Sequence, residues 1–276
     1  MYFTDILTQA HFLRFFLVYP IFYFSDILNI DAEFLFKITC FINLSLITLN
    51  CIFTLKFYEK NNLLFITLFF CSLFICISAF MNGRIIFSFL GFSYFVLSLH
   101  KWEFYKINDT SLLLKIFISL FLCSVSTGTF LANVIVLFSW MFFYFGRKKG
   151  MINIYLLSLL ISLSPIIYLY LFKNINYYGG GFTGFLNMLD HGLGFIFYLV
   201  DLDVLLLLVL NILIAGFLTV FFYFRAKKFQ LLSLIILNTT FAGFFGFSTL
   251  TLALIPLSIF LLAFLVNYLN KMFPTI

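Results

Sequence analysis

The chain has 276 residues, of which 64% are hydrophobic and only 9% are charged, and its formal net charge is +6. Soluble proteins carry about 25% charged residues, so this composition excludes a soluble globular protein. Only a lipid bilayer can solvate a chain with a mean hydropathy of +1.16. We therefore expect a single integral membrane domain over residues 1–276, all-α and polytopic, without a nucleic-acid partner.

The apolar runs predict about ten membrane-spanning helices, because one span needs about 20 apolar residues. They cover residues 6–24, 35–55, 63–82, 84–99, 112–127, 129–145, 151–172, 202–224, 229–247 and 249–270. Short stretches connect most of them, and residues 100–106 are expected to be such a loop. The segment 173–201 differs from the rest of the chain and is predicted to be a long loop.

The basic residues predict which side of the membrane each loop faces. With the N-terminus inside, Arg84 and Lys173 are the basic residues of the outer loops, and the inner loops carry many more. The inner set is Lys56, Lys60, Lys101, Lys106, Arg147, Lys148, Lys149, Arg225, Lys227, Lys228 and Lys271. Because Lys and Arg favour cytoplasmic loops, both termini are predicted to be cytoplasmic and the loop 173–201 to lie outside.

Two arginines are candidates for binding a diphosphate, since ionisable residues at membrane depth are costly and usually functional. Arg84 follows Asn82 and Gly83 on the outer side, against the general charge bias. A guanidinium there can bind a phosphate in bidentate fashion, or it can lie among lipid headgroups. Arg14 falls within the first predicted span and is expected to pair with an acid or a second phosphate.

The long loop contains the candidate catalytic residues. His191 has the natural general-base side chain near pH 7, and the adjacent Asp190 is the alternative base. An ordinary loop histidine is the competing interpretation. Tyr177 and Tyr178 precede three glycines, and tyrosine rings suit sugar faces, although a flexible turn would have the same sequence.

The turn between the fifth and sixth spans contains Ser126 and Thr127. Their hydroxyls are candidates for binding sugar or phosphate, or for packing between membrane helices. The five cysteines lie in apolar runs, and the three histidines lack metal-ligand spacing. We therefore expect no disulfide framework, no metal and no cofactor.

Three features together support a resemblance to a known family. They are Asn82-Gly83-Arg84 at the outer start of one helix, Ser126-Thr127-Gly128 opening a later one, and an outer loop with Tyr, Gly and His. In this pattern, over residues 82–192, the chain resembles the Wzy-type O-antigen or capsular repeat-unit polymerases of bacterial surface polysaccharide systems. Members often have an arginine at the Ser/Thr-Gly turn, which this chain lacks, so Arg14 is the candidate second arginine.

The resemblance implies a metal-independent glycosyltransferase of the bacterial inner membrane. Such an enzyme joins undecaprenyl-diphosphate-linked oligosaccharide repeat units into O-antigen or capsular polysaccharide, and the loop 173–201 would be periplasmic. Arg84, with Arg14, would stabilise the leaving diphosphate, and His191 or Asp190 would take the proton of the acceptor hydroxyl. A flippase and a chain-length regulator are the implied protein partners.

Three other functions remain open from the sequence. A transporter or flippase would need charged groups and broken helices at the membrane midplane, where Arg14 is the main candidate. Another lipid-linked glycosyltransferase, of the metal-dependent type, would carry paired acids in its first outer loop. Asp26, Asp31 and Glu33 lie near one another there but are not paired. An accessory membrane subunit is the third.

Overall fold

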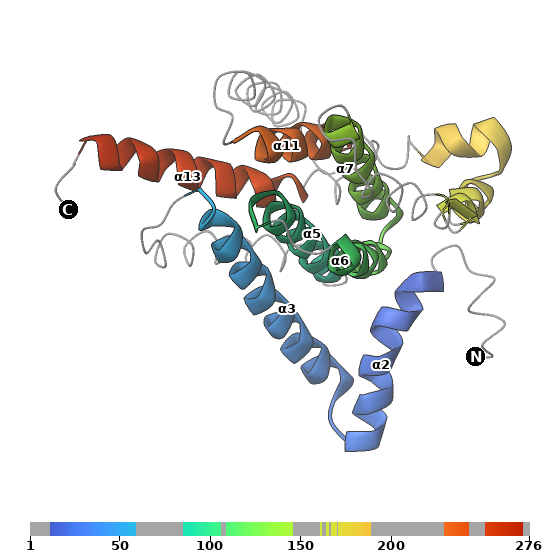
Figure 1. Ribbon diagram of the computed structural model, residues 1–276. Helices are drawn as coiled ribbons and strands as arrows, with labels where there is room; N and C mark the ends of the chain where they lie inside the picture. Colours follow the sequence, from blue (N-terminus) through green and yellow to red (C-terminus); the bar gives the residue numbers. More distant parts are fainter. Residues whose placement is uncertain are drawn as a thin grey trace, which may run out of the picture. The chain divides into compact units, whose positions relative to one another are not determined.

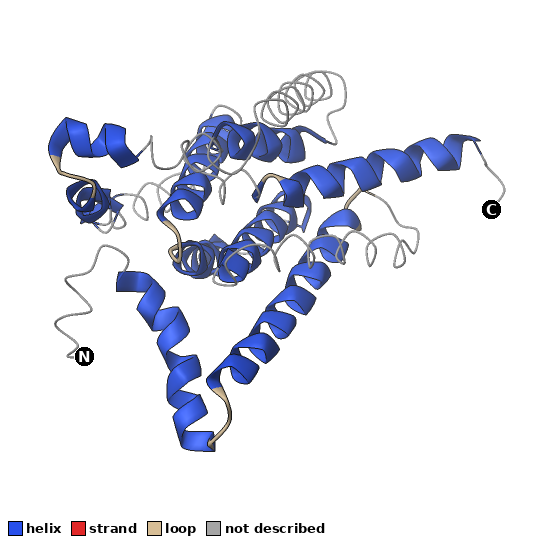
Figure 2. Ribbon diagram, turned by 180° about the vertical axis from the view of Figure 1, so that it is seen from behind, coloured by secondary structure: helices blue, strands red, loops and turns tan. Residues whose placement is uncertain are grey.

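The described part of the chain is helical. The computed structural model describes residues 12–58, 85–105, 109–145, 161, 164–165, 167–169, 171–188, 229–242 and 252–272, and these ranges contain helices and turns but no strand (Figure 2). The main helices are α2 (Phe12–Leu28), α3 (Ala32–Leu55), α5 (Ile85–Tyr105), α6 (Asp109–Cys123), α7 (Thr127–Phe145), α11 (Gln230–Ala242) and α13 (Leu254–Met272) (Figure 1). Two shorter helical stretches, 171–177 and 181–188, enclose a turn. The predicted all-α class is confirmed for these residues.

Among the described residues, two helices are long and apolar enough to cross a membrane. They are α3, with 24 residues, and α5, with 21. At a rise of 1.5 Å per residue each is about 30 Å long or more, which matches the hydrocarbon thickness of a bilayer. The predicted spans 63–82 and 202–224 lie outside the described residues. The helices α6 and α7 coincide with two further predicted spans to within a few residues.

The joint between α2 and α3 is closed by local hydrogen bonds. Asn29, just after α2, has a φ of 50°, in the left-handed region that asparagine tolerates. The amide of Ile30 donates to the Ser25 carbonyl at 3.1 Å, and the Ser25 hydroxyl donates to the Ile30 carbonyl at 2.7 Å. These bonds satisfy the polar groups left over where α2 ends.

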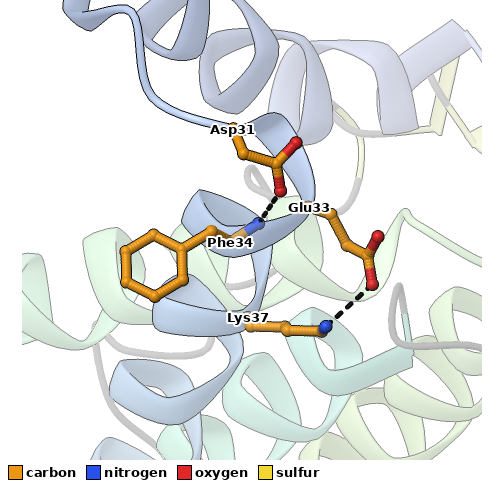
Figure 3. Close-up of polar contacts among 4 residues, drawn as sticks. All are labelled: Asp31, Glu33, Phe34 and Lys37. Carbon is orange, nitrogen blue, oxygen red and sulfur yellow. Dashed lines mark hydrogen bonds and ion pairs between the residues drawn. The ribbon is translucent and has the colours of Figure 1, made fainter.

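The first turns of α3 engage two of the acids predicted to lie in the first outer loop. Oδ2 of Asp31 accepts from the Phe34 amide at 2.9 Å and caps the helix (Figure 3). Glu33 pairs with Lys37, one turn further on, at 2.7 Å. Both acids therefore have local partners on the helix itself.

Internal contacts divide the chain into two compact units. The first comprises Met1–Leu17 and Cys123–Ala253, and the second comprises Val18–Leu122 and Leu254–Ile276. In the first unit α7 packs against α11, and in the second α5 packs against α3 and α13. Each unit therefore combines segments that are distant in the sequence.

Polar side chains join the packed helices of the second unit. Asn50 on α3 donates to the Ser93 hydroxyl on α5 at 3.0 Å. Ser119 on α6 donates to the carbonyl of Gly91 on α5 at 2.8 Å. Such hydrogen bonds between apolar helices are a common device in membrane proteins, where no water competes for them.

The prediction that residues 100–106, including His100, form a loop is wrong. The helix α5 continues to Tyr105, and His100 is fully buried within it. Its Nδ1 lies 2.7 Å from the Val96 carbonyl and its Nε2 lies 2.6 Å from the Tyr58 hydroxyl. A neutral imidazole with the proton on Nδ1 satisfies both bonds. The charges at 101–106 suggested a loop, but the helix tolerates them at its end.

Pro256 lies within the predicted span 249–270, where a proline could kink the helix. The helix α13 begins at Leu254, so Pro256 lies in its first turn. Amides in the first turn have no intrahelical acceptor, and a proline there removes no helical hydrogen bond. Pro256 is therefore compatible with a regular start of α13.

Candidate functional site at the 171–188 hairpin

A turn fixed by side-chain hydrogen bonds precedes α7. The fully buried Thr129 hydroxyl lies 2.7 Å from the Cys123 carbonyl and 2.9 Å from the Ser126 carbonyl. The Phe130 amide donates to Ser126 O at 3.0 Å as the first bond of the helix. Ser126 and Thr127 are partly exposed at this helix start. Their hydroxyls therefore lie on a turn that hydrogen bonds hold in one conformation.

The three glycines of the predicted loop end one helix and begin another. The amides of Gly179 and Gly180 donate to the carbonyls of Asn176, at 3.2 Å, and Ile175, at 3.0 Å. This is the Schellman arrangement, which needs a left-handed residue after the helix. Gly179, Gly180 and Gly181 have φ values of 114°, 78° and 57°. Only glycine adopts such a run without strain, so the backbone explains the sequence here.

The two helical stretches pack closely against each other and form what we call the 171–188 hairpin. A Cβ on Gly184 would collide with the carbonyl oxygen of Ile175 in the facing helix. Asn187 donates from Nδ2 to the Tyr178 carbonyl at 3.0 Å, which ties the second helix to the turn. Part of the segment predicted to be a loop, 173–188, is therefore helical over most of its length.

One hydrogen bond joins the hairpin to the start of α7. The Thr127 hydroxyl donates to Oδ1 of Asn174 at 2.9 Å, across 47 residues of sequence. Asn174 is completely buried, and both residues belong to the first unit. The structure therefore brings together two segments that the sequence analysis selected separately, the Ser126–Thr127 turn and the Tyr177–Tyr178 segment.

The rings of Tyr177 and Tyr178 contact each other three and four residues after Asn174 in the chain. Their rings are perpendicular, with centroids 5.1 Å apart. Tyr177 is exposed and Tyr178 is half-buried. Partial burial is the main cause that raises the pKa of Tyr178 above its ordinary value, and electrostatic interaction with the nearby Tyr177 raises it further. The Tyr178 hydroxyl therefore stays protonated at neutral pH, where it can donate a hydrogen bond.

The remaining predicted site residues are placed as follows. Arg84, Asp190 and His191 lie outside the described residues, and the last two follow Met188 by two and three positions in the sequence. Arg14 is half-buried in the first described turn of α2. Its guanidinium carbon lies 5.9 Å from the centroid of the Phe15 ring, a cation–π contact within its own helix.

Asn174 and Asn187 were not among the predicted site residues, although Asn174 binds Thr127 and Asn187 binds the Tyr178 carbonyl. A signal was present, because residues 173–188 contain three asparagines within an apolar chain. Buried amides need partners, so asparagines in such a segment indicate a hydrogen-bonded structure. Comparisons of the chain with family models, with curated proteins and with solved structures gave no match.

Proposed function

We propose that this chain is a membrane-embedded glycosyltransferase that polymerises lipid-linked oligosaccharide repeat units, with both termini in the cytoplasm of a bacterial cell. The substrate is an oligosaccharide on undecaprenyl diphosphate, and the product is O-antigen or capsular polysaccharide. The hydrogen bond between Thr127 and Asn174 is the observation that carries the proposal. It links two of the three sequence features that support the resemblance to Wzy-type polymerases.

The joined segments offer groups suited to a sugar. The exposed Tyr177 ring provides an apolar face for stacking, and the Tyr178 hydroxyl provides a donor. Ser126 and Thr127 add two hydroxyls at the start of α7. Sugar recognition needs this combination of an aromatic face with several fixed polar groups.

The chemistry is a displacement at the anomeric carbon of the growing chain. A hydroxyl of the incoming repeat unit forms a new C–O bond, while the bond between the anomeric carbon and the diphosphate breaks. The bonding electrons leave with undecaprenyl diphosphate, and the hydroxyl proton passes to His191 or Asp190. Arg84, with Arg14 as the second candidate, stabilises the negative charge that develops on the leaving group.

Deleting the gene in its host and separating the surface polysaccharide by size tests the activity. Loss of the long-chain ladder, with a single repeat unit left on the lipid acceptor, is the expected result. If no repeat unit reaches the outer side, a flippase or an earlier transferase is the better assignment. An unchanged ladder would remove the protein from polymer assembly.

Complementation with variants then tests the site. Arg84→Ala and His191→Ala, expressed at the parent level, are expected to lose the ladder. Full restoration by both variants would show that the proposed residues are wrong. Thr127→Val should shorten the ladder and Thr127→Ser should restore it, because serine keeps the hydroxyl that binds Asn174.

A further inference from the structure

We propose that the 171–188 hairpin lies in the membrane interface, with one face of its second helix against the acyl chains of the outer leaflet. The inference rests on the membrane placement in the proposed function and does not depend on the polymerase activity. In this arrangement the hairpin binds lipid and is not a hydrophilic loop in water, so the bilayer is the partner of the hairpin.

The hairpin carries no charged residue after Lys173 in its first helix. Residues 174–189 contain no Asp, Glu, Lys or Arg, and Lys173 and Asp190 directly flank this stretch. A water-exposed stretch of this length would carry about four charged residues at the frequency found in soluble proteins. Uncharged, aromatic-rich segments flanked by charges are typical of the membrane–water interface.

The second helix of the hairpin, residues 181–188, has two distinct faces. Phe182, Phe185 and Leu186 follow helical spacing on one side, and Thr183 and Asn187 follow it on the other. Phe182 is 74% exposed and Leu186 is 46% exposed. An apolar face exposed to this extent is unfavourable in water and favourable against lipid.

Several polar groups at the turn of the hairpin are paired within the hairpin. The amides of Gly179, Gly180 and Gly184 donate to carbonyls within the hairpin, and Asn187 donates to the Tyr178 carbonyl. Backbone that enters a region of low water content must meet this condition, because unpaired amides cost several kcal/mol there. The glycine turn can therefore enter the interface without leaving these groups unpaired.

Exposed apolar residues also lie at the start of the hairpin and just before it. Tyr168 and Leu169, before the hairpin, and Phe172, in its first helix, are exposed, and the rings of Tyr168 and Phe172 stack with centroids 5.7 Å apart. Tyr168 and Leu169 belong to a segment predicted to be a span, so lipid contact would extend along the chain from span to hairpin.

Fluorescence quenching in vesicles tests the proposal. The parent chain, Phe182→Trp and Thr183→Trp are reconstituted in phosphatidylcholine with or without bromine on the acyl chains, and aqueous iodide is added in parallel. The parent emission, from Trp102 and Trp140, is subtracted. The tryptophan introduced at position 182 should lose most of its emission to brominated lipid and little to iodide. The one at position 183, on the polar face, should show the opposite preference.

Leu186→Trp is a second reporter for the apolar face and should behave like Phe182→Trp. Quenching of both by iodide, without loss to brominated lipid, would overturn the proposal. Protection from both quenchers would also overturn it, because protein would then cover this face, and the particle mass would show whether a second copy does so. The vesicles hold no isoprenoid lipid, so bromine quenching assigns the contact to bilayer acyl chains.

The outcome separates this inference from the proposed function. A water-exposed hairpin in a chain that still restores the polysaccharide ladder would leave the polymerase and remove the interfacial element. If the hairpin contacts lipid but deletion of the gene leaves the ladder unchanged, the interfacial element is kept and the polymerase function is wrong.

Discussion

Asn174 is buried completely, yet its amide side chain joins two segments that lie 47 residues apart. A buried amide in an apolar surrounding is stable only when its polar atoms are bonded. The Thr127 hydroxyl provides one of these bonds, and it therefore contributes to the position of the Tyr177–Tyr178 segment. Asn174 and Thr127 act first as positioning residues for this site.

Removing that hydroxyl should destabilise the first unit. Thr127→Val deletes the donor and keeps the shape, so the free energy of unfolding should fall by about 1 kcal/mol, with Thr127→Ser closer to the parent. Thermal unfolding in detergent measures the difference. If Thr127→Val added nothing to the loss caused by Asn174→Leu, the bond would be confirmed as shared. Full additivity of the two losses would contradict it.

The hydrogen bond between Tyr58 and His100 gives a second prediction at the residue scale. Tyr58→Phe leaves the fully buried His100 Nε2 without this donor, and the free energy of unfolding should fall by about 1–3 kcal/mol. Tyr105→Phe is the matched control, because Tyr105 ends the helix that carries His100 but its side chain is exposed. Equal losses of thermal stability in the two variants would show that the bond contributes nothing.

At the scale of elements, the close approach of the hairpin helices depends on Gly184. Gly184→Ala should cost about 1–3 kcal/mol, because the added Cβ meets the Ile175 carbonyl and the backbones must separate. This loss would exceed the gain of about 1 kcal/mol expected from alanine in a helix. Thr183→Ala, on the exposed side of the same helix, should stay near the parent in thermal unfolding. A Gly184→Ala variant at least as stable as the parent would contradict the packing.

The start of α3 bears on both the predicted topology and the metal-dependent alternative. Lys37 lies near the end of α3 predicted to face outward, where basic residues are rare. Its ion pair with Glu33 balances that charge locally. A metal ion bound by this region would have to displace the Asp31 cap or the Glu33–Lys37 pair, since both acids are engaged on the helix.

At the scale of the whole molecule, fusion reporters test the predicted orientation. Green fluorescent protein after Ile276 should fluoresce, because it folds in the cytoplasm, and alkaline phosphatase after Met188 should be active, because it requires the outer side. Exchanging the two reporters is the control and should silence both. A fluorescent fusion after Met188 would reverse the orientation of the hairpin and contradict the positive-inside assignment.

Hydropathy and helical spacing were enough to predict several of the described helices. The length of apolar sequence determines α3, α6 and α7 to within a few residues. The predicted end of α5 was wrong. A polar residue such as His100 indicates a loop only if it has no buried partner, and its partner Tyr58 lies 42 residues away in the sequence, where the local pattern does not reveal it. The hairpin was missed because glycine and asparagine indicate a turn, but the turn connects helices whose packing depends on a backbone contact.

The separation of Thr127 and Asn174 in the sequence also determines when their contact can form during synthesis. A ribosome finishes the turn before α7 while its partner is still 47 residues from being made. The two stretches predicted to be spans, 129–145 and 151–172, must be synthesised in between. A chain arrested within them would carry the Ser126–Thr127 turn without Asn174, so this contact can form only after both stretches have been made.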